Sequence, residues 1–303
     1  MRSCDRRLLV TGATGLIGRE LAEPLLARGF EVHAITVDEV NPDNGFRWLK
    51  GSLFDAAFVD DAVRHVRPTH LLNLAWITTG DYLASPLNTR FLEAGLALAH
   101  AFAREGGRRA VYAGSCLEYR LGGDRPIRET DALDVEKTAY TRAKDALRRG
   151  ADAIFSAAGV SFAFGRIFYA FGRGEARTRL TGLVIDRLSH GERLAIKAGP
   201  LLKDYVYSKD IAGAFAALLD ADASGCVNIC TGRAVSIRGY VTAIARKLGR
   251  EDLLDFVDDC ADQPPVVLGD DRRLRDEVGY RVRYGLDAAI DEVLAAERGG
   301  LPG

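Results

Sequence analysis

The chain has 303 residues, 48% of them hydrophobic, and its 41 Lys and Arg nearly balance its 42 Asp and Glu. This length and apolar content predict a globular protein with a large core and exclude a disordered chain. The near-neutral charge disfavours a nucleic-acid-binding protein that relies on a broad basic surface, because such proteins cluster Lys and Arg against phosphates.

Short β-branched segments alternate with longer helical patterns along the first half of the chain. The predicted strands lie at 8–10, 32–35, 70–74, 110–113 and 160–164, and the predicted helices lie near 16–28, 87–104 and 135–157. This alternation predicts an α/β fold, a Rossmann-type doubly wound parallel sheet of six or more strands.

The alternation weakens after residue 165, where glycine and arginine become frequent. This change predicts a smaller, mixed α/β lobe in the C-terminal half. We therefore assign residues 1–165 to a dinucleotide-binding domain, to which parts of 204–232 return. Residues 166–303 are assigned mainly to a substrate-binding lobe.

A glycine-rich turn follows the first predicted strand and contains Gly12, Gly15 and Gly18. In this context glycines permit a tight turn and a close approach of the backbone to the pyrophosphate of a dinucleotide. The positive end of the helix that follows favours the same group. Leu16 and Ile17 lie inside the turn, so we predict that they also contact the cofactor.

Thr36 ends the second predicted strand, at the position where an acidic residue normally holds the adenosine ribose of NAD. A neutral hydroxyl does not repel a 2'-phosphate, and Arg19 can supply positive charge beside it. The sequence therefore favours NADP(H) over NAD(H). Asp38, two residues further on, keeps NAD as the alternative.

A phenol and an ammonium, those of Tyr140 and Lys144, stand four residues apart on one face of a predicted helix. Hydride chemistry on a carbonyl needs a group that both donates and accepts a proton, and a tyrosine whose pKa is lowered by a neighbouring cation can do both near neutral pH. Ser115 ends a strand at the edge where open sheets of this type build their sites, and its hydroxyl can bind the substrate oxygen. We predict these three residues to be catalytic.

Together with the segment 203–210, these motifs resemble the extended short-chain dehydrogenase/reductases that act on nucleotide-activated sugars. The resemblance covers nearly the whole chain and implies a nucleotide-diphosphate sugar as substrate and a homodimer formed by the helices near 87–104 and 135–157. It also implies that Tyr140 and Lys144 contact the cofactor, with Lys144 on the nicotinamide ribose. Further residues implied at the cofactor are Leu53, Leu74, Ala75 and Phe168. Ser52 replaces the usual aspartate of the adenine-binding turn.

Three reactions occur among the enzymes that the chain resembles. Dehydratases carry an Asp-Glu pair after the catalytic hydroxyl residue, whereas this chain has Cys116 and Leu117, so we exclude dehydration. Tyr169 stands where 4-epimerases commonly have an asparagine. We therefore favour a 4-ketoreductase that transfers hydride from NADPH to C4 of a nucleotide-diphospho-4-keto-6-deoxysugar. A 4-epimerase with tightly bound NAD is the alternative, and a non-catalytic NADP-sensing regulator is a remote one, because such regulators lose the catalytic Tyr or Lys.

The segment 166–209 contains nine Lys and Arg against four Asp and Glu, a sign that suits a diphosphate. The predicted substrate-binding residues are Trp76, Tyr82, Tyr169, Arg179 and Lys203. The five histidines lack metal-ligand spacing, so we predict no metal site.

The five cysteines, at positions 4, 116, 226, 230 and 260, show no paired CxxC spacing. This usage favours a reducing compartment over a disulfide framework. The N-terminus has no apolar segment of signal-peptide length, and no stretch is long enough to cross a bilayer. We therefore expect a cytoplasmic protein that acts without a membrane or nucleic acid.

Overall fold

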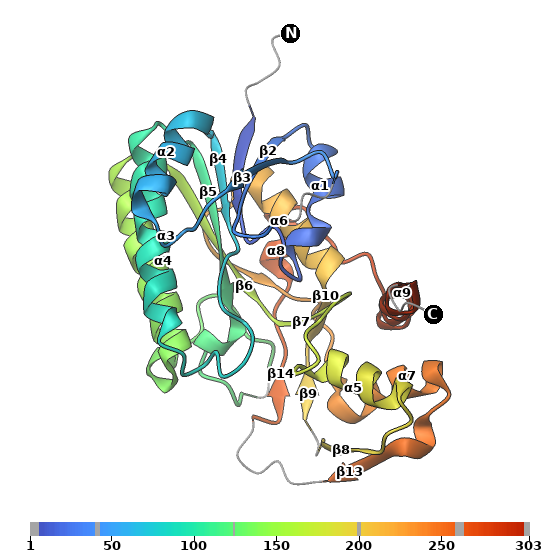
Figure 1. Ribbon diagram of the computed structural model, residues 1–303. Helices are drawn as coiled ribbons and strands as arrows, with labels where there is room; N and C mark the ends of the chain where they lie inside the picture. The colour runs from blue at the N-terminus through green and yellow to red at the C-terminus, as the bar shows by residue number, and fades with distance from the viewer. Residues whose placement is uncertain (1–5, 40–42, 124, 199–200, 258–263, 300–303) are drawn as a thin grey trace.

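The computed structural model describes residues 6–39, 43–123, 125–198, 201–257 and 264–299. A parallel seven-stranded sheet, in the order β11-β6-β5-β4-β1-β2-β3, forms its centre (Figure 1). The strands are β1 (Arg7–Thr11), β2 (Glu31–Thr36), β3 (Arg47–Lys50), β4 (His70–Asn73), β5 (Arg109–Ser115), β6 (Ser161–Ile167) and β11 (Gly225–Ile229). The strand order changes direction between β1 and β4, so the predicted doubly wound fold is confirmed.

Helices cover both faces of this sheet (Figure 1). One face carries α2 (Ala56–Val66), α3 (Leu87–Arg104) and α4 (Ala139–Ala157), and the other carries α1 (Ala22–Leu26), α6 (Ser208–Asp220) and α8 (Arg272–Asp276). Because side chains alternate along a strand, Leu8 and Val10 enter the core under α6, whereas Leu9 enters the core under α2 and α3. Burial on both faces explains the continuous apolar character of these strands.

The first predicted helix, at 16–28, is broken in the structure. A 3-10 turn, η1 (Gly18–Glu20), is followed by the five-residue helix α1. Pro24 lies inside α1, where it has no N–H to donate and its ring conflicts with the carbonyl four residues earlier. The sequence prediction of one long helix after the glycine turn was therefore wrong.

Strand β3 and helix α2 had no counterpart among the predicted elements. In β3 both ends are exposed and the two central residues are only half-buried, because it is the edge strand of the sheet. An edge strand of this kind lacks the apolar run that marks the buried strands. Helix α2 begins at the N-cap Asp55, whose carboxylate accepts from the N–H of Ala57 and of Phe58.

A smaller mixed α/β lobe lies below the sheet in Figure 1. Its helices are α5 (Leu180–Ser189), α7 (Ile237–Leu248) and α9 (Leu286–Gly299), and its short strands are β7 (Tyr169–Phe171), β8 (Leu194–Lys197), β9 (Leu202–Lys203), β10 (Tyr205–Tyr207), β12 (Val235–Ser236), β13 (Leu254–Val257) and β14 (Val266–Val267). The lobe has its own core, in which Val184, Leu188 and Ile244 are buried.

Asp204, between β9 and β10, ties several loops together. One carboxylate oxygen accepts from the N–H and the hydroxyl of Thr231, and the other accepts from the N–H of Gly232 and of Gly269. Four donors on one buried carboxylate fix the position of β9 and β10 against the end of β11.

Three further properties of the described residues bear on the predictions. None of their helices combines the length and the apolar character that crossing a bilayer requires. Cys116 and Cys230 are buried and Cys226 is half-buried, all three as free thiols. The other two cysteines, Cys4 and Cys260, lie outside the described residues.

Candidate active site

A pocket of about 600 Å³ opens at the carboxyl ends of the sheet strands, between the sheet and the smaller lobe. This is the edge at which doubly wound sheets bind their ligands. Most residues assigned to the site from the sequence line this pocket: Gly12, Gly15, Leu16, Ile17, Gly18, Arg19, Thr36, Leu53, Leu74, Ala75, Trp76, Tyr82, Ser115, Tyr140, Phe168, Tyr169 and Arg179. The glycine turn and two of the three catalytic candidates, Ser115 and Tyr140, therefore face one space, whereas Lys144 does not line it.

The glycine turn forms one wall of the pocket. Gly12 has a φ of +73°, and a Cβ at this position would lie 2.7 Å from the backbone nitrogen of Ala75. A Cβ at Gly18 would lie 2.1 Å from the carbonyl oxygen of Gly12. Only glycine fits at either position, and the turn leaves the bare backbone cradle that a pyrophosphate requires. The residues present thus fit a dinucleotide cofactor.

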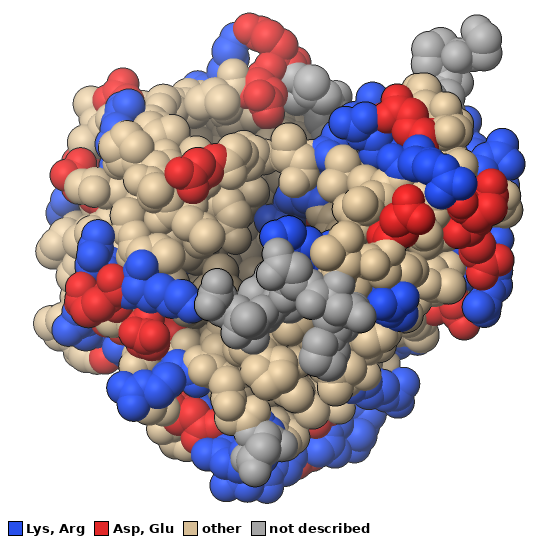
Figure 2. Space-filling view, turned by 90° about the horizontal axis from the view of Figure 1, so that it is seen from below, with Lys and Arg blue, Asp and Glu red and all other residues tan. Residues whose placement is uncertain are grey.

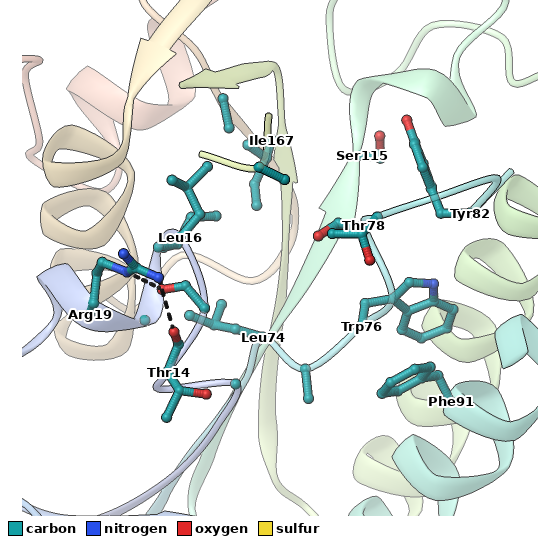
Figure 3. Close-up of a pocket in the computed structure, with 18 of the residues that line it drawn as sticks. Thr14, Leu16, Arg19, Leu74, Trp76, Thr78, Tyr82, Phe91, Ser115 and Ile167 are labelled. Atoms are coloured by element: carbon teal, nitrogen blue, oxygen red, sulfur yellow. Dashed lines mark hydrogen bonds between the residues drawn. The ribbon is translucent and has the colours of Figure 1, made fainter. Parts of the chain in front are cut away.

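The segment 172–176, which we call the strap, crosses this wall from the smaller lobe. The guanidinium of Arg19 donates to the carbonyl oxygens of Thr14 (3.4 Å), Gly15 (3.3 Å) and Arg173 (3.3 Å). It also packs against Gly174, where a Cβ would lie 2.2 Å from its Nη1. Figure 3 shows Arg19 turned back over Thr14. The arginine expected to attract a 2'-phosphate thus instead joins the glycine turn to the strap.

A second contact holds the strap from the same side. Arg173 lies 3.5 Å from the carboxylate of Glu20, whose side chain is 7% exposed. The N–H of Gly174 donates to Glu297 of α9 at 3.2 Å. The strap is therefore joined both to the glycine turn and to the C-terminal helix.

Ser115 and Tyr140 come from two neighbouring elements. Ser115 ends β5 and caps the 3-10 turn η2 (Cys116–Glu118), where its hydroxyl accepts from the N–H of Leu117 at 3.2 Å. Tyr140 is the second residue of α4, a helix that Thr138 caps through the N–H of Thr141. These two caps bring the two hydroxyl side chains together at the mouth of the sheet.

The electrostatics of Tyr140 differ from the sequence expectation. Burial raises the pKa of the Tyr140 phenol, and the hydrogen bond with the Ser115 hydroxyl opposes this rise. We expected Lys144 to lower this pKa, but its ammonium lies 5.9 Å from the centre of the Tyr140 ring and donates to the carbonyl oxygen of Ala113 at 2.9 Å. The structure therefore shows no lowering of this pKa by Lys144, and burial dominates instead.

Lys144 lies behind the pocket wall and is only 4% exposed. Burial lowers the pKa of its ammonium, and the carboxylate of Glu118 opposes this fall. The ammonium also lies 3.8 Å from the centre of the Trp76 ring. Two groups, a carboxylate and an aromatic face, thus stabilise the buried charge.

Aromatic side chains form the wall opposite the glycine turn (Figure 3). Trp76 stacks on Phe91 with ring centres 5.5 Å apart, and Trp76 and Tyr82 both meet the Tyr140 ring edge to face. The side of the pocket where Tyr140 lies is therefore lined by aromatic rings. Phe91 had no sequence signal, because it lies in an ordinary apolar position of α3.

Of the two basic residues predicted to bind substrate, Arg179 lines the pocket and Lys203 does not. Arg179 lines the pocket, where its guanidinium donates to the carboxylate of Glu175 at 3.1 Å. Lys203 is 3% exposed, donates to the carbonyl oxygen of Pro264 at 3.1 Å, and is not among the residues that line the pocket. Of the two, Arg179 is thus the one placed to reach a ligand there.

The positive balance of the segment 166–209 does not produce an open basic surface. Acidic partners pair with most of its cations: Arg177 with Asp186, Arg187 with Glu192, Arg193 with Asp255 and Lys209 with Glu292. Figure 2 accordingly shows red and blue side chains interspersed over the underside of the molecule. The excess of Lys and Arg in the segment 166–209 therefore did not predict an unpaired positive charge at the protein surface.

Sequence reasoning missed a buried ion pair behind Ser115. The carboxylate of Glu118 accepts from the N–H of Ser115 at 2.8 Å and from Nε of Arg166 at 3.0 Å. A signal was present, since a serine followed by a glutamate three residues later forms a capping box, and Arg166 interrupts an apolar strand. Among the described residues, no cluster of His, Cys, Asp and Glu is arranged to hold a metal ion.

Comparison with known proteins places this geometry in context. Residues 8–230 match the family described as the NAD dependent epimerase/dehydratase family. The chain is 25% identical to a UDP-glucose 4-epimerase of Azospirillum brasilense, over 96% of this chain and 92% of that protein. It is 30% identical to the spore coat polysaccharide biosynthesis protein SpsK of Bacillus subtilis (strain 168), but over only 46% of this chain and 45% of that protein.

A solved structure shares the fold over nearly the whole chain. It is that of the UDP-glucose 4-epimerase of Thermus thermophilus in complex with NAD, which matches with a TM-score of 0.85 at 23% identity. The match covers 97% of this chain and all of that one. The similarity shows that the two proteins share one fold.

Proposed function

Since the chain belongs to the NAD dependent epimerase/dehydratase family, we propose that it transfers hydride at C4 of a nucleotide-diphosphate sugar. The observation that carries this proposal is that Ser115 and Tyr140 face the same pocket as the glycine turn. A proton-transfer pair and a pyrophosphate cradle in one space are what hydride exchange between a dinucleotide and a sugar needs.

In this proposal the chain's own residues divide the work. Ser115 holds the C4 oxygen, and Tyr140 takes the proton of a C4 hydroxyl or returns it to a C4 carbonyl. Lys144 would hold the nicotinamide ribose in its charged form, which burial disfavours by lowering the pKa of the ammonium to about 7. When bound, the nicotinamide would take up the C4 hydride and give it back. The aromatic rings of Trp76 and Tyr82, which pack against Tyr140, would shield the reacting carbon from water.

We infer that the cofactor is NAD, in contrast to the sequence preference for NADP. The Thr36 hydroxyl accepts the backbone N–H of Asp38 at 3.0 Å, and Asp38 directly follows the lining residues Thr36 and Val37, where we propose that the adenosine ribose binds. A carboxylate there repels a 2'-phosphate. Arg19, the cation expected to attract that phosphate, is bonded to the strap instead.

Between the two reactions that remain, the strap favours 4-epimerisation. Epimerisation returns the hydride within one catalytic cycle, so its cofactor stays bound. Arg19 joins the strap to the glycine turn and Arg173 joins it to Glu20 of η1, and we propose that the strap thereby hinders the release of a bound dinucleotide. The relatives named as UDP-glucose 4-epimerases agree with this preference.

Net reduction of a 4-keto sugar is the second candidate, and one observation favours it. Burial raises the pKa of Tyr140, so the phenol keeps the proton that a carbonyl oxygen must receive. A bound positive charge at the nicotinamide site would offset part of this rise, which is why we rank reduction second.

The state of the purified protein separates the two reactions. For the epimerase we expect NAD to copurify with the protein, to survive gel filtration, and to be identified by mass spectrometry after release. UDP-glucose should then equilibrate with UDP-galactose with no cofactor added. A protein that purifies empty and consumes NADPH with a nucleotide-4-keto sugar would instead establish the reductase.

Replacement of Tyr140 tests the proton transfer that the epimerase and the reductase mechanisms have in common. We expect Tyr140→Phe to lower turnover by about 10²- to 10⁴-fold, because the phenyl ring cannot transfer a proton. Cofactor content should remain near that of the unchanged protein, since the ring still packs against Tyr82. Unchanged turnover would remove Tyr140 from the mechanism.

A further inference from the structure

The aromatic ring of Trp76 lies against the ammonium of Lys144. The centre of its ring lies 3.8 Å from the Lys144 ammonium, within the range of a strong cation–π contact. The same ring meets Tyr140 edge to face at 6.3 Å. One side chain therefore touches both residues of the predicted Tyr-Lys pair.

The orientation of the Trp76 ring is fixed from behind. Its indole N–H donates to the side-chain oxygen of Asn88 at 2.8 Å. Asn88 is 1% exposed, and its amide nitrogen donates to the carbonyl oxygens of Tyr82 (2.7 Å) and Ser85 (2.9 Å). These three bonds leave the amide no freedom to turn, so the indole presents one defined face to the ammonium.

An aromatic face has a particular advantage beside a catalytic lysine. Burial disfavours the charged form of Lys144, and a carbonyl or carboxylate that offset this cost would take up an N–H donor. A ring face attracts the charge without accepting a hydrogen bond. It therefore stabilises the ammonium while leaving N–H donors for a bound ribose.

We propose that Trp76, oriented by Asn88, is a positioning residue that keeps Lys144 charged and directed at the nicotinamide ribose. This inference rests on the proposed function for the role of Lys144, but not for the contact itself. It differs from the expectation that Trp76 binds the sugar, and it assigns a purpose to Asn88, which no motif singled out.

Other ionisable groups near the Lys144 ammonium also bear on its pKa. The Glu118 carboxylate faces it from the turn after β5 and is itself paired with Arg166. The phenols of Tyr140 and Tyr82 and the thiol of Cys116 also lie at this end of the pocket. Trp76 also packs against Tyr140, so Trp76→Phe, which keeps a ring at this position, is the control for an effect of the replacement on that phenol.

The pH dependence of turnover provides the first test. Loss of the ring face destabilises the charged form of Lys144, so the alkaline fall of kcat should move to lower pH by about one unit in Trp76→Leu. Trp76→Phe keeps a smaller face and should move it less. A side chain that only packs would lower kcat equally at every pH, and an unmoved alkaline limb in Trp76→Leu would overturn the proposal. If Trp76→Leu does not fold, the shift in Trp76→Phe decides.

Fluorescence provides a second test that does not depend on turnover. The chain has two tryptophans, so Trp48→Phe leaves Trp76 as the sole indole. Its emission should change as the ammonium loses its proton, and adding Lys144→Met should abolish this titration. A titration that persists in Lys144→Met would overturn the proposal. Failure of the unchanged protein to act on any nucleotide sugar would refute the proposed function, whereas the titration would still test the Trp76 contact.

Discussion

The carboxylate of Glu118 and the guanidinium of Arg166 form an ion pair of 3.0 Å in which the two side chains are 0% and 2% exposed. The other carboxylate oxygen of Glu118 accepts the N–H of Ser115. Burial raises the pKa of Glu118, and the charge of Arg166 opposes this rise. The last residue of β5 is thus held by a charged pair in the interior, directly behind the pocket.

Replacing one member of this ion pair should lower the free energy of unfolding more than replacing both members. In Glu118→Gln the buried Arg166 loses its counter-charge, and we expect the free energy of unfolding to fall by about 3–5 kcal/mol in urea titrations. The double variant Glu118→Leu with Arg166→Met removes both charges, leaves neither one unpaired, and should recover part of the loss. Arg64→Ala breaks an exposed pair with Asp61 and, as the control, should cost less than about 1 kcal/mol. Equal losses in the buried and exposed variants would contradict this account.

The glycine turn should not tolerate a methyl group. A Cβ in Gly18→Ala would meet the backbone of Gly12 and Ala13, which cannot move without opening the turn. We expect cofactor binding, measured by calorimetry or by cofactor content, to be lost. Gly123→Ala, where a Cβ meets nothing within 4 Å, is the matched control and should bind normally. Normal binding by Gly18→Ala would show that the turn does not cradle the pyrophosphate.

The strap should govern how long the cofactor stays. In Arg19→Ala the glycine turn loses its bond to the carbonyl of Arg173, so we expect bound NAD to be lost on gel filtration or dilution. Arg142→Ala removes the same charge from an exposed site on α4 and should retain the cofactor. Equal release rates in the two variants would argue against a retaining role for the strap and would favour the reductase.

His70, in β4, should make the fold sensitive to acid. Burial, with help from nearby arginines, lowers the pKa of its imidazole to about 4, below its ordinary value of 6.5. The unfolded chain therefore binds a proton that the folded chain rejects, and stability falls as the pH drops from about 6.5 to about 4. Because the His70 side chain is partly exposed, we expect the free energy of unfolding to fall by only about 1 kcal/mol over this pH range. In urea titrations, the free energy of unfolding should differ less between pH 7 and pH 4.5 for His70→Gln than for the unchanged protein.

Local patterns in the sequence predicted those parts of the site that depend on neighbours in the chain. The glycine turn, Ser115 at a strand end, and Tyr140 and Lys144 on one helical face are all set by periods and turns of a few residues. The resemblance to the extended short-chain dehydrogenase/reductases is confirmed by the family match. The break at Pro24 was also visible in the sequence, but the helical pattern around it outweighed it.

Contacts between distant segments could not be predicted in this way. Arg19 and Arg173 are 154 residues apart, and Glu118 and Arg166 are 48 apart. The residues themselves were readable, but their partners were not, because side-chain hydrogen bonds and ion pairs depend on which surfaces the packed core brings together. For the same reason the basic balance of 166–209 did not reveal that most of its cations are paired.

The sequence by itself determined the parallel sheet and the glycine turn, and it singled out the side chains proposed to react, because each follows from local backbone preference and side-chain period. Only the tertiary structure decided the surroundings of those side chains. Packing placed Trp76 over Lys144, buried Tyr140 so that its pKa rises, and turned Arg19 from the ribose to the strap. Burial and distance set the energy of a charge, and both quantities exist only once the chain has folded.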